Sequence, residues 1–230
     1  MEVYIILLAL AGFVALDTTG GPQLLISEPL VSCTLAGYIL GSVETGIMIG
    51  MLFQLLWFGY LPLGAVRMPD SNMSAFISTV SLITAGKIFT MDAIEQMAAI
   101  IPALLFGLGA GIAGSKLQTA VRRLNGAASD RLLDKLEEGE SFSIEYRHLH
   151  GMLRSFSRGI LMACILIPLC TVLCGSITIL PDKLIAGLAS MKPLIWGTAC
   201  ASAVIVSIMK GNTLHLISGA AGGVLWLTIL

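Results

Sequence analysis

One stretch of the chain, residues 28–79, restricts the possible folds more than any other. It is apolar enough to lie in a lipid bilayer, yet glycines and prolines interrupt it throughout. Within it stand the polar residues Glu44, Gln54, Arg67, Asp70, Ser71 and Asn72. Broken helices at membrane depth persist only where the freed backbone is buried in protein or lines a wet cavity. Charged and polar groups there are costly, so we expect this stretch to form the substrate site of a membrane carrier.

The composition extends this interpretation to the whole chain. Of its 230 residues, 56% are hydrophobic and 12% charged, and the mean hydropathy is +0.91. Soluble domains carry about a quarter charged residues, so the sequence predicts an all-α polytopic membrane protein. The formal net charge of −1 does not indicate the excess of basic residues that nucleic-acid-binding proteins carry. The first charge, Glu2, is acidic, which indicates a retained first helix rather than a signal peptide.

The apolar segments before residue 60 are short or broken. Residues 3–16 fall short of the roughly 20 residues that a perpendicular span needs. Residues 23–26 form a second short run. A helix opened by Pro29 is expected to reach about residue 40, and the next to cover 46–60 after a glycine-containing break. These lengths predict half-spanning or re-entrant elements, arranged around a site near the middle of the bilayer.

Residues 61–72 are expected to be irregular, because prolines, a glycine, an arginine and an aspartate fall close together there. Asp70 and Ser71 are suited to cap a helix over 72–84.

A second capping signal follows. Asp92, with Glu95 three residues later, predicts the start of a helix over 93–113, which contains Pro102 and is long enough to span with a kink.

A polar segment, residues 116–158, divides an N-terminal membrane region (1–115) from a C-terminal one (159–230). It holds most of the chain's basic residues: Lys116, Arg122, Arg123, Arg131, Lys135, Arg147, Arg154 and Arg158. Leu124, Ala128, Leu132 and Leu136 recur at helical spacing. We therefore expect an amphipathic helix that ends at Gly139, then a second polar helix from Ile144. The positive bias predicts a cytoplasmic location.

Apolar chain resumes after this segment. Spans are expected over 159–180, with Pro168 as an internal kink, over 193–209 and over 213–230, and a short surface helix over 185–189.

No residue pattern indicates a cofactor, a metal site or a nucleophile with its base. Cys33, Cys164, Cys170, Cys174 and Cys200 all lie in apolar surroundings and are expected to pack as small apolar residues. His148 and His150 stand on different faces of a helix, which favours a surface role over metal binding. His215 is expected to be a buried imidazole. The chain is therefore not expected to be an enzyme by itself.

Residues 28–70 resemble the IIC subunit of the mannose/fructose/sorbose class of bacterial sugar phosphotransferase systems. The residues that match the family pattern are Pro29, Leu30, Cys33, Thr34, Leu35, Gly37, Leu40, Gly41, Thr45, Gly46, Gly50, Gly64, Pro69 and Asp70. Residues 124–140 are similar to the polar helix of that family. Two departures from the pattern are Gln54, where many members carry glutamate, and Pro62, where many carry a polar residue.

This resemblance implies a multi-pass subunit in the bacterial inner membrane that forms an oligomeric translocation channel with a IID partner. It would bind a hexose of the mannose, fructose, sorbose or N-acetyl-hexosamine type. Cytoplasmic IIA and IIB phosphocarrier proteins would phosphorylate the sugar as it arrives inside. Two alternatives stay open: an ion-coupled secondary transporter in which Asp70 or Glu44 binds a cation, and a non-transporting membrane scaffold.

Each expected site residue has a structural alternative. Asp70 either accepts from sugar hydroxyls or caps the following helix, and Gln54 either contacts the sugar or joins helices. Ser71 and Asn72 are expected to be further, weaker candidates for sugar binding. Arg67 and Glu44 are supporting residues: Arg67 either pairs with Asp70 or Glu44, or extends to the membrane interface.

Overall fold

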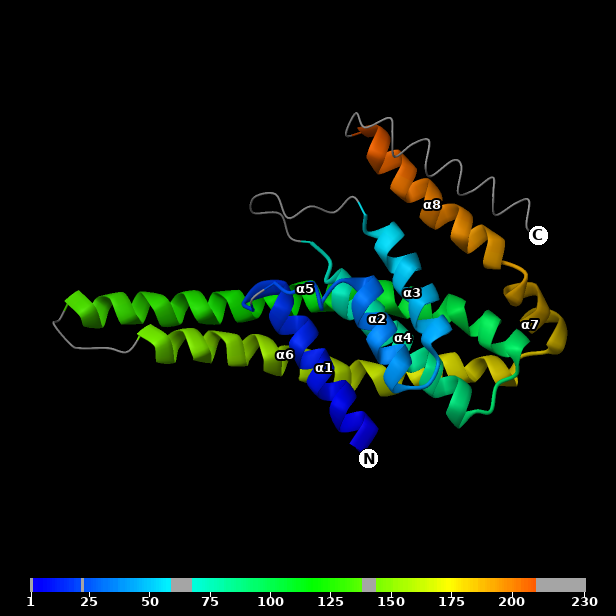
Figure 1. Cartoon of the computed structure of the whole chain (residues 1–230), viewed down its shortest axis with the longest axis horizontal. Coiled ribbons are helices and arrows are strands. Elements are labelled where there is room, and N and C mark those ends of the chain that lie inside the picture. Colours follow the sequence, from blue (N-terminus) through cyan, green and yellow to red (C-terminus); the bar gives the residue numbers. More distant parts are fainter. Residues whose placement is uncertain (1, 22, 59–67, 138–143, 210–230) are drawn as a thin grey trace.

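The computed structural model describes residues 2–21, 23–58, 68–137 and 144–209, and this part of the chain contains helices and no strand. Figure 1 shows the arrangement. The helices are α1 (Glu2–Thr19), α2 (Pro29–Ile39), α3 (Val43–Leu56), α4 (Ser71–Ile88), α5 (Ala93–Glu137), α6 (Ile144–Gly175), the 3-10 helix η1 (Ser176–Ile179), α7 (Asp182–Ala189) and α8 (Lys192–Met209). The prediction of an all-α fold is confirmed.

Helix α4 lies at the centre of the bundle. Every residue from Met73 to Ala85 is buried, and α1, α2, α3, α5 and α6 all pack against this helix. Its hydroxyl groups bond to neighbouring helices: Ser78 donates to the carbonyl of Ala103 on α5 (2.8 Å), and Ser81 to that of Ile167 on α6 (3.2 Å). In an apolar environment such bonds hold helices together without exposing unpaired polar groups.

Glycines allow the helices to approach closely. A Cβ on Gly46 of α3 would lie 2.4 Å from the carbonyl oxygen of Cys33 on α2. One on Gly159 of α6 would lie 2.3 Å from the carbonyl oxygen of Ala11 on α1. Small residues have this role in membrane helix packing.

Helices α2 and α3 form a hairpin shorter than a bilayer. At 1.5 Å per residue their 11 and 14 residues extend about 16 and 21 Å, against about 30 Å of hydrocarbon. Gly41, with φ +70, turns the chain at the tip. The second helix starts at Val43 rather than at residue 46, so the break between the two helices is shorter than predicted.

The first helix was predicted too short. The expectation was residues 3–16, but α1 runs from Glu2 to Thr19 and includes Asp17. The Asp17 carboxylate is buried and accepts from the backbone N–H groups of Leu24 (2.6 Å) and Ser27 (3.1 Å), so the helix continues past this charge. Residues 23–26 belong to a turn folded against Asp17 and not to a re-entrant helix.

The polar segment is not made of separate helices. The helix expected over 93–113 continues without a break to Glu137, and the polar helix expected from Ile144 continues through the next apolar segment to Gly175. The change in composition marks where two long helices leave the apolar bundle, because their backbone hydrogen bonds are the same on both sides of that point. These projecting parts, residues 116–137 and 144–154, are called the arm below (Figure 1).

The remaining predicted boundaries are close to those observed. Helix α4 covers Ser71–Ile88 where 72–84 was expected, α7 covers Asp182–Ala189 where 185–189 was expected, and α8 begins at Lys192. Gly139 and the span expected over 213–230, with His215, lie outside the described residues.

Within the described ranges, three helical stretches are long and apolar enough to cross a membrane: Ala93–Leu132, Glu145–Ile179 and Asp182–Val204. The chain is thus a multi-pass membrane protein.

Candidate functional site

Asp70 stands at the N-terminus of the central helix and caps it. Its side chain accepts from the backbone N–H of Met73 (3.2 Å), and its own N–H donates to the carbonyl of Gly111 on α5 (2.9 Å). The helix cap expected from the sequence is therefore present. It places a carboxylate where α4 and α5 meet.

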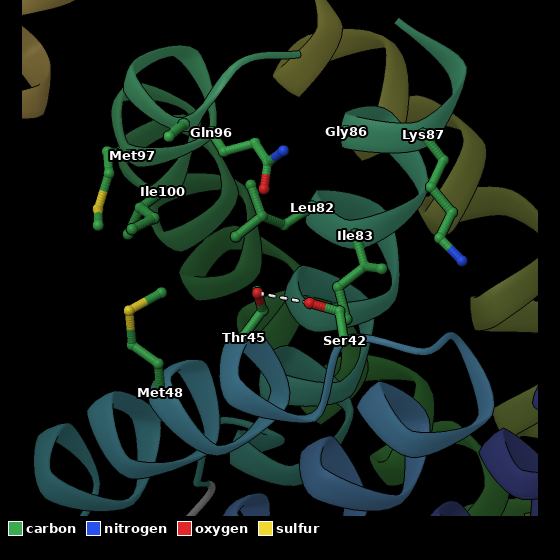
Figure 2. A pocket seen from close by; sticks show the side chains of 11 residues that line it. Ser42, Thr45, Met48, Leu82, Ile83, Gly86, Lys87, Gln96, Met97 and Ile100 are labelled. Atoms are coloured by element: carbon green, nitrogen blue, oxygen red, sulfur yellow. Dashed lines mark hydrogen bonds between the residues drawn. The ribbon is translucent and has the colours of Figure 1, made fainter. Parts of the chain in front are cut away.

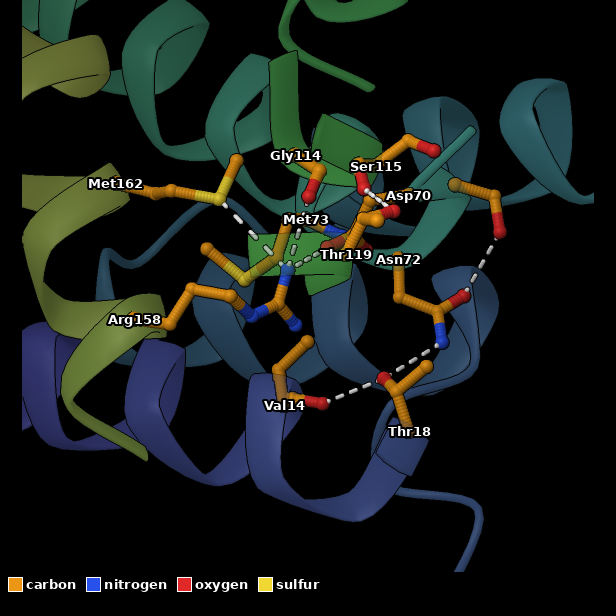
Figure 3. Close-up of polar contacts among 11 residues, drawn as sticks. Val14, Thr18, Asp70, Asn72, Met73, Gly114, Ser115, Thr119, Arg158 and Met162 are labelled. Carbon is orange, nitrogen blue, oxygen red and sulfur yellow. Dashed lines mark hydrogen bonds and ion pairs between the residues drawn. The ribbon is translucent and has the colours of Figure 1, made fainter. Parts of the chain in front are cut away.

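The second oxygen of Asp70 pairs with Arg158 of α6 (Figure 3). Asp70 is 3% exposed and Arg158 4% exposed, so the ion pair is buried among α4, α5 and α6. Gly114 of α5 makes room for it, because a Cβ there would lie 2.7 Å from the Cβ of Asp70. A buried charge that loses its partner costs several kcal/mol, so the two residues fix the start of α4 together.

Arg158 was not among the site residues predicted from the sequence. It was counted with the other basic residues of the polar segment. Its position in the sequence could have identified it. Arg158 stands directly before the apolar run that begins at Gly159, where an arginine side chain is buried in the helix bundle and not exposed to water. Its Nη2 group is buried and has no hydrogen-bond partner in the described part of the chain, which leaves a donor beside the Asp70 carboxylate.

Ser71 and Asn72 form a polar edge next to this ion pair. The Ser71 hydroxyl donates to Asn72 Oδ1 (3.1 Å). Asn72 Nδ2 donates to Thr18 Oγ1 at the end of α1 (3.1 Å), as Figure 3 shows. Both residues are half-buried, unlike Asp70. The structure thus brings three of the predicted site residues together, two of them where a ligand could reach them.

Gln54 lies at the end of α3 and bonds to the start of α2. Its Nε2 donates to Glu28 Oε2 (2.9 Å), and its Oε1 accepts from the backbone N–H of Leu30 (3.4 Å). Because Lys87 at the end of α4 bonds to the Leu40 carbonyl at the end of α2, α2 and α4 start at the same end of the bundle. Gln54 and Glu28 therefore lie toward the Asp70 end, with no direct bond between Gln54 and Asp70 among the described contacts.

The two supporting residues do not join this cluster. Glu44 is exposed in the first turn of α3, at the other end of the hairpin from Gln54. Arg67 lies outside the described residues.

The described residues contain no group of three or more His, Cys, Asp or Glu side chains placed to hold a metal ion. His148 is exposed, and the ring of His150 lies 4.5 Å from that of Tyr146 on the arm. The groups that the described residues bring to the Asp70 end are hydroxyl, amide, carboxylate and guanidinium groups, all of which form hydrogen bonds.

Comparisons with known sequences agree on one family. The profile of the family described as the PTS system sorbose-specific IIC component matches residues 3–217. The fructose permease IIC component of Bacillus subtilis (strain 168) is 31% identical over 125 residues, which cover 54% of this chain and 42% of that protein. The mannose-specific EIIC component of Escherichia coli (strain K12) is 41% identical over 59 residues, 26% of this chain and 22% of that protein. These alignments span less than half the length of either relative.

Two solved structures share the fold. A structure described only as a membrane protein superposes with a TM-score of 0.69 at 21% identity, covering 100% of this chain and 93% of the other. The mannose transporter ManYZ, in complex with microcin E492, gives a TM-score of 0.55 at 20% identity, covering 94% of this chain and 79% of that chain.

Proposed function

Because this chain belongs to the family of sorbose-specific IIC components of sugar phosphotransferase systems, we propose that it binds a hexose within the membrane and moves it inward. A IIB partner phosphorylates the sugar on arrival. In this proposal the chain is a transport subunit, and the phosphoryl chemistry belongs to its partners.

The polar cluster at the start of α4 supports this function best. Asn72 and Ser71 offer amide and hydroxyl groups on a half-buried edge, and hexose hydroxyls both donate and accept hydrogen bonds. Asp70 has one bond at each oxygen, while an ionised carboxylate offers about four lone-pair sites. It therefore has lone pairs left for a sugar hydroxyl as well as for Arg158, whose Nη2 is a further donor. Both side chains are buried, so in this proposal they meet the sugar when this end of the bundle opens.

Gln54 completes the proposed site. A glutamine has both a donor and an acceptor, so it can bridge two hydroxyls of a sugar. In the structure Gln54 is half-buried and bonds to Glu28. An exchange of this bond for bonds to a sugar would connect ligand binding to the contact between α2 and α3.

The basic residues nearest the bundle support an orientation in the bacterial inner membrane in which the arm lies in the cytoplasm. Lys116, Arg122 and Arg123 are exposed where α5 leaves the apolar region, and acidic residues on α5 follow only from Asp130. Positive charge close to a span favours the cytoplasmic side. The arm then projects toward the soluble IIA and IIB proteins.

A IID partner is supported by the helices that cannot cross a bilayer alone. The α2–α3 hairpin has exposed apolar side chains, including Leu30, Val31, Leu35 and Ile47. Irregular chain at membrane depth must be covered by protein. We propose that a IID subunit covers the hairpin in an oligomeric assembly.

Binding of labelled hexoses to the purified complex of this chain with its IID partner tests the proposal. We expect saturable binding of at least one hexose of the mannose, fructose, sorbose or N-acetyl-hexosamine type, and none of a disaccharide. A properly folded complex that binds none of these hexoses would contradict the proposed function.

A further inference from the structure

A cavity of about 310 Å³ lies at the opposite end of α4 from Asp70. The start of α3, the last turns of α4 and the first turns of α5 line it, and one side is open. Its lining residues are Ser42, Thr45, Met48, Leu82, Ile83, Gly86, Lys87, Ala93, Gln96, Met97 and Ile100.

The cavity is separate from the cluster at the start of α4. From Asp70 to Gly86 the helix rises about 24 Å at 1.5 Å per residue. The arm extends from the Asp70 end, because Arg158 at its base bonds to Asp70. The cavity therefore lies toward the membrane face opposite the arm.

One side of the cavity is polar. The Ser42 hydroxyl donates to Thr45 Oγ1 (2.8 Å), and Gln96 Nε2 donates to the Met91 carbonyl (2.9 Å). These bonds fix the two polar groups and leave the Thr45 hydroxyl hydrogen and Gln96 Oε1 free to bond to a ligand. Lys87 bonds to the Leu40 carbonyl and adds a positive charge at the rim.

The other side is apolar. Met48, Met97 and Ile100 face the cavity in Figure 2, and methionine adapts to irregular ligand surfaces. No carboxylate occurs among the described lining residues, so the groups present do not suit a cation. A neutral polyol suits this arrangement. Its hydroxyls can bond to the fixed hydroxyl and amide groups, and its C–H groups can pack against the apolar side chains opposite them.

We propose that this cavity is a second hexose site, where unphosphorylated sugar is held before it reaches the cluster at the start of α4. The volume is at the lower end of the range for small-molecule sites. Entry of the sugar at this end of the bundle agrees with the proposed position of the arm, which faces the phosphocarrier proteins at the opposite end. The inference rests on the proposed function.

Thiol protection tests the second site. A Cβ on Gly86 would lie 3.4 Å from the Gln96 side chain, so Gly86→Cys places a thiol beside the proposed ligand. We expect the transported hexose to slow its reaction with a membrane-impermeant reagent at least five-fold in the assembled complex. Gly187→Cys, on exposed α7 with nothing within 4 Å of its Cβ, is the matched control and should react at the same rate with and without sugar.

Further variants separate this site from the first one. Protection of Gly86→Cys should persist in an Asn72→Leu background, and Gln96→Leu should raise the sugar concentration needed for it about ten-fold. Met97→Cys, which lines the cavity but supplies none of the proposed polar contacts, gives the same readout if Gly86→Cys does not insert. Absence of protection by a hexose that the complex does transport would overturn the second site while leaving the proposed function intact. Protection by added phospholipid alone would overturn it as well. A complex that binds no hexose would remove the proposed function and this inference together.

Discussion

At the scale of single residues, the buried pair of Asp70 and Arg158 is the feature with the largest expected energetic effect. Asp70 also caps α4, and asparagine caps helices about as well as aspartate. Asp70→Asn therefore tests the charge and leaves the cap in place.

We expect Asp70→Asn to lower the free energy of unfolding by about 3–5 kcal/mol, because it leaves Arg158 buried without its partner. Arg158→Met should cost a similar amount. The double variant should lose much less than the sum of the two, since no unpaired charge remains. Denaturant unfolding in detergent measures all three. Arg154→Met, one turn earlier on the half-exposed arm, is the control. It loses bonds to the Leu124 carbonyl and to Asn125 near solvent and leaves no charge buried, so it should cost about 1–2 kcal/mol, less than either change to the buried pair. Additive losses in the double variant would show that the pair is not coupled.

The polar edge gives a second prediction at this scale. Asn72→Leu keeps the number and branching of the side-chain heavy atoms and removes the amide, so hexose affinity should fall about five- to ten-fold, as expected for roughly 1 kcal/mol per neutral hydrogen bond. Gln54→Leu should act in the same direction. Asn125→Leu, on the arm, removes an amide that is also half-buried and bonded to a side chain, and should leave affinity unchanged. Equal effects of Asn72→Leu and Asn125→Leu on labelled-hexose binding would count against the site.

At the scale of helices, close packing between α2 and α3 determines the geometry of the hairpin. The carbonyl oxygen of Cys33 occupies the space that a side chain at Gly46 would need. The contact joins backbone to backbone, so no flexible side chain can move aside.

We expect Gly46→Ala to lower the free energy of unfolding by about 1–3 kcal/mol, the usual cost of overpacking. Gly109→Ala on α5 is the matched control, because nothing lies within 4 Å of its added Cβ. It should be neutral or stabilise by up to about 1 kcal/mol, since alanine favours a helix over glycine. Thermal unfolding of the two variants in the same detergent compares them. A stability of Gly46→Ala equal to that of Gly109→Ala would mean that the hairpin is packed less closely than described.

The helices also show how far the sequence could predict the fold. Caps at Asp70, and at Asp92 with Glu95, are local signals, and both were predicted correctly: Asp92 N–H donates to Glu95, and Glu95 N–H to Asp92. The length of α1 was not predictable in this way, because Asp17 is satisfied by the backbone of a later turn. The continuity of α5 was missed because a change from apolar to polar composition was taken for a helix end.

The site was only partly predictable for a related reason. Ser71, Asn72 and Asp70 are consecutive, so their proximity was certain. The pairing of Asp70 with Arg158 joins residues far apart in the sequence and depends on how α6 packs against α4. The cavity at the end of α4 depends on three helices meeting, and no local pattern marks it.

At the scale of the whole molecule, the polar arm and the short α7 lie at opposite ends of α6, and in the proposed orientation they lie on opposite faces of the membrane. The arm begins at one end of α6, and α7 follows the other end. Ser129 on the arm and Ser190 after α7 are both exposed.

We expect Ser129→Cys to resist a membrane-impermeant thiol reagent in intact cells and to react after permeabilisation, because the proposed orientation places the basic arm in the cytoplasm. Ser190→Cys should react in intact cells and serves as the matched control. The native Cys164, exposed in α6, is replaced by serine in both variants. Reaction of Ser129→Cys in intact cells would show that the arm lies outside the cell, which contradicts the proposed orientation.

The most direct test of the central claim, that this chain translocates hexose for phosphorylation by partner proteins, is the chemical form of the imported sugar. Membrane vesicles from a host without its own sugar phosphotransferase permeases are prepared with the chain, a IID subunit, or both, and loaded with phosphoenolpyruvate and the soluble phosphocarriers including IIA and IIB. External labelled hexose should then appear inside as hexose phosphate only when the chain and the IID subunit are present together. Accumulation of free hexose by the chain alone, driven by an ion gradient, would contradict the account and support an ion-coupled transporter instead.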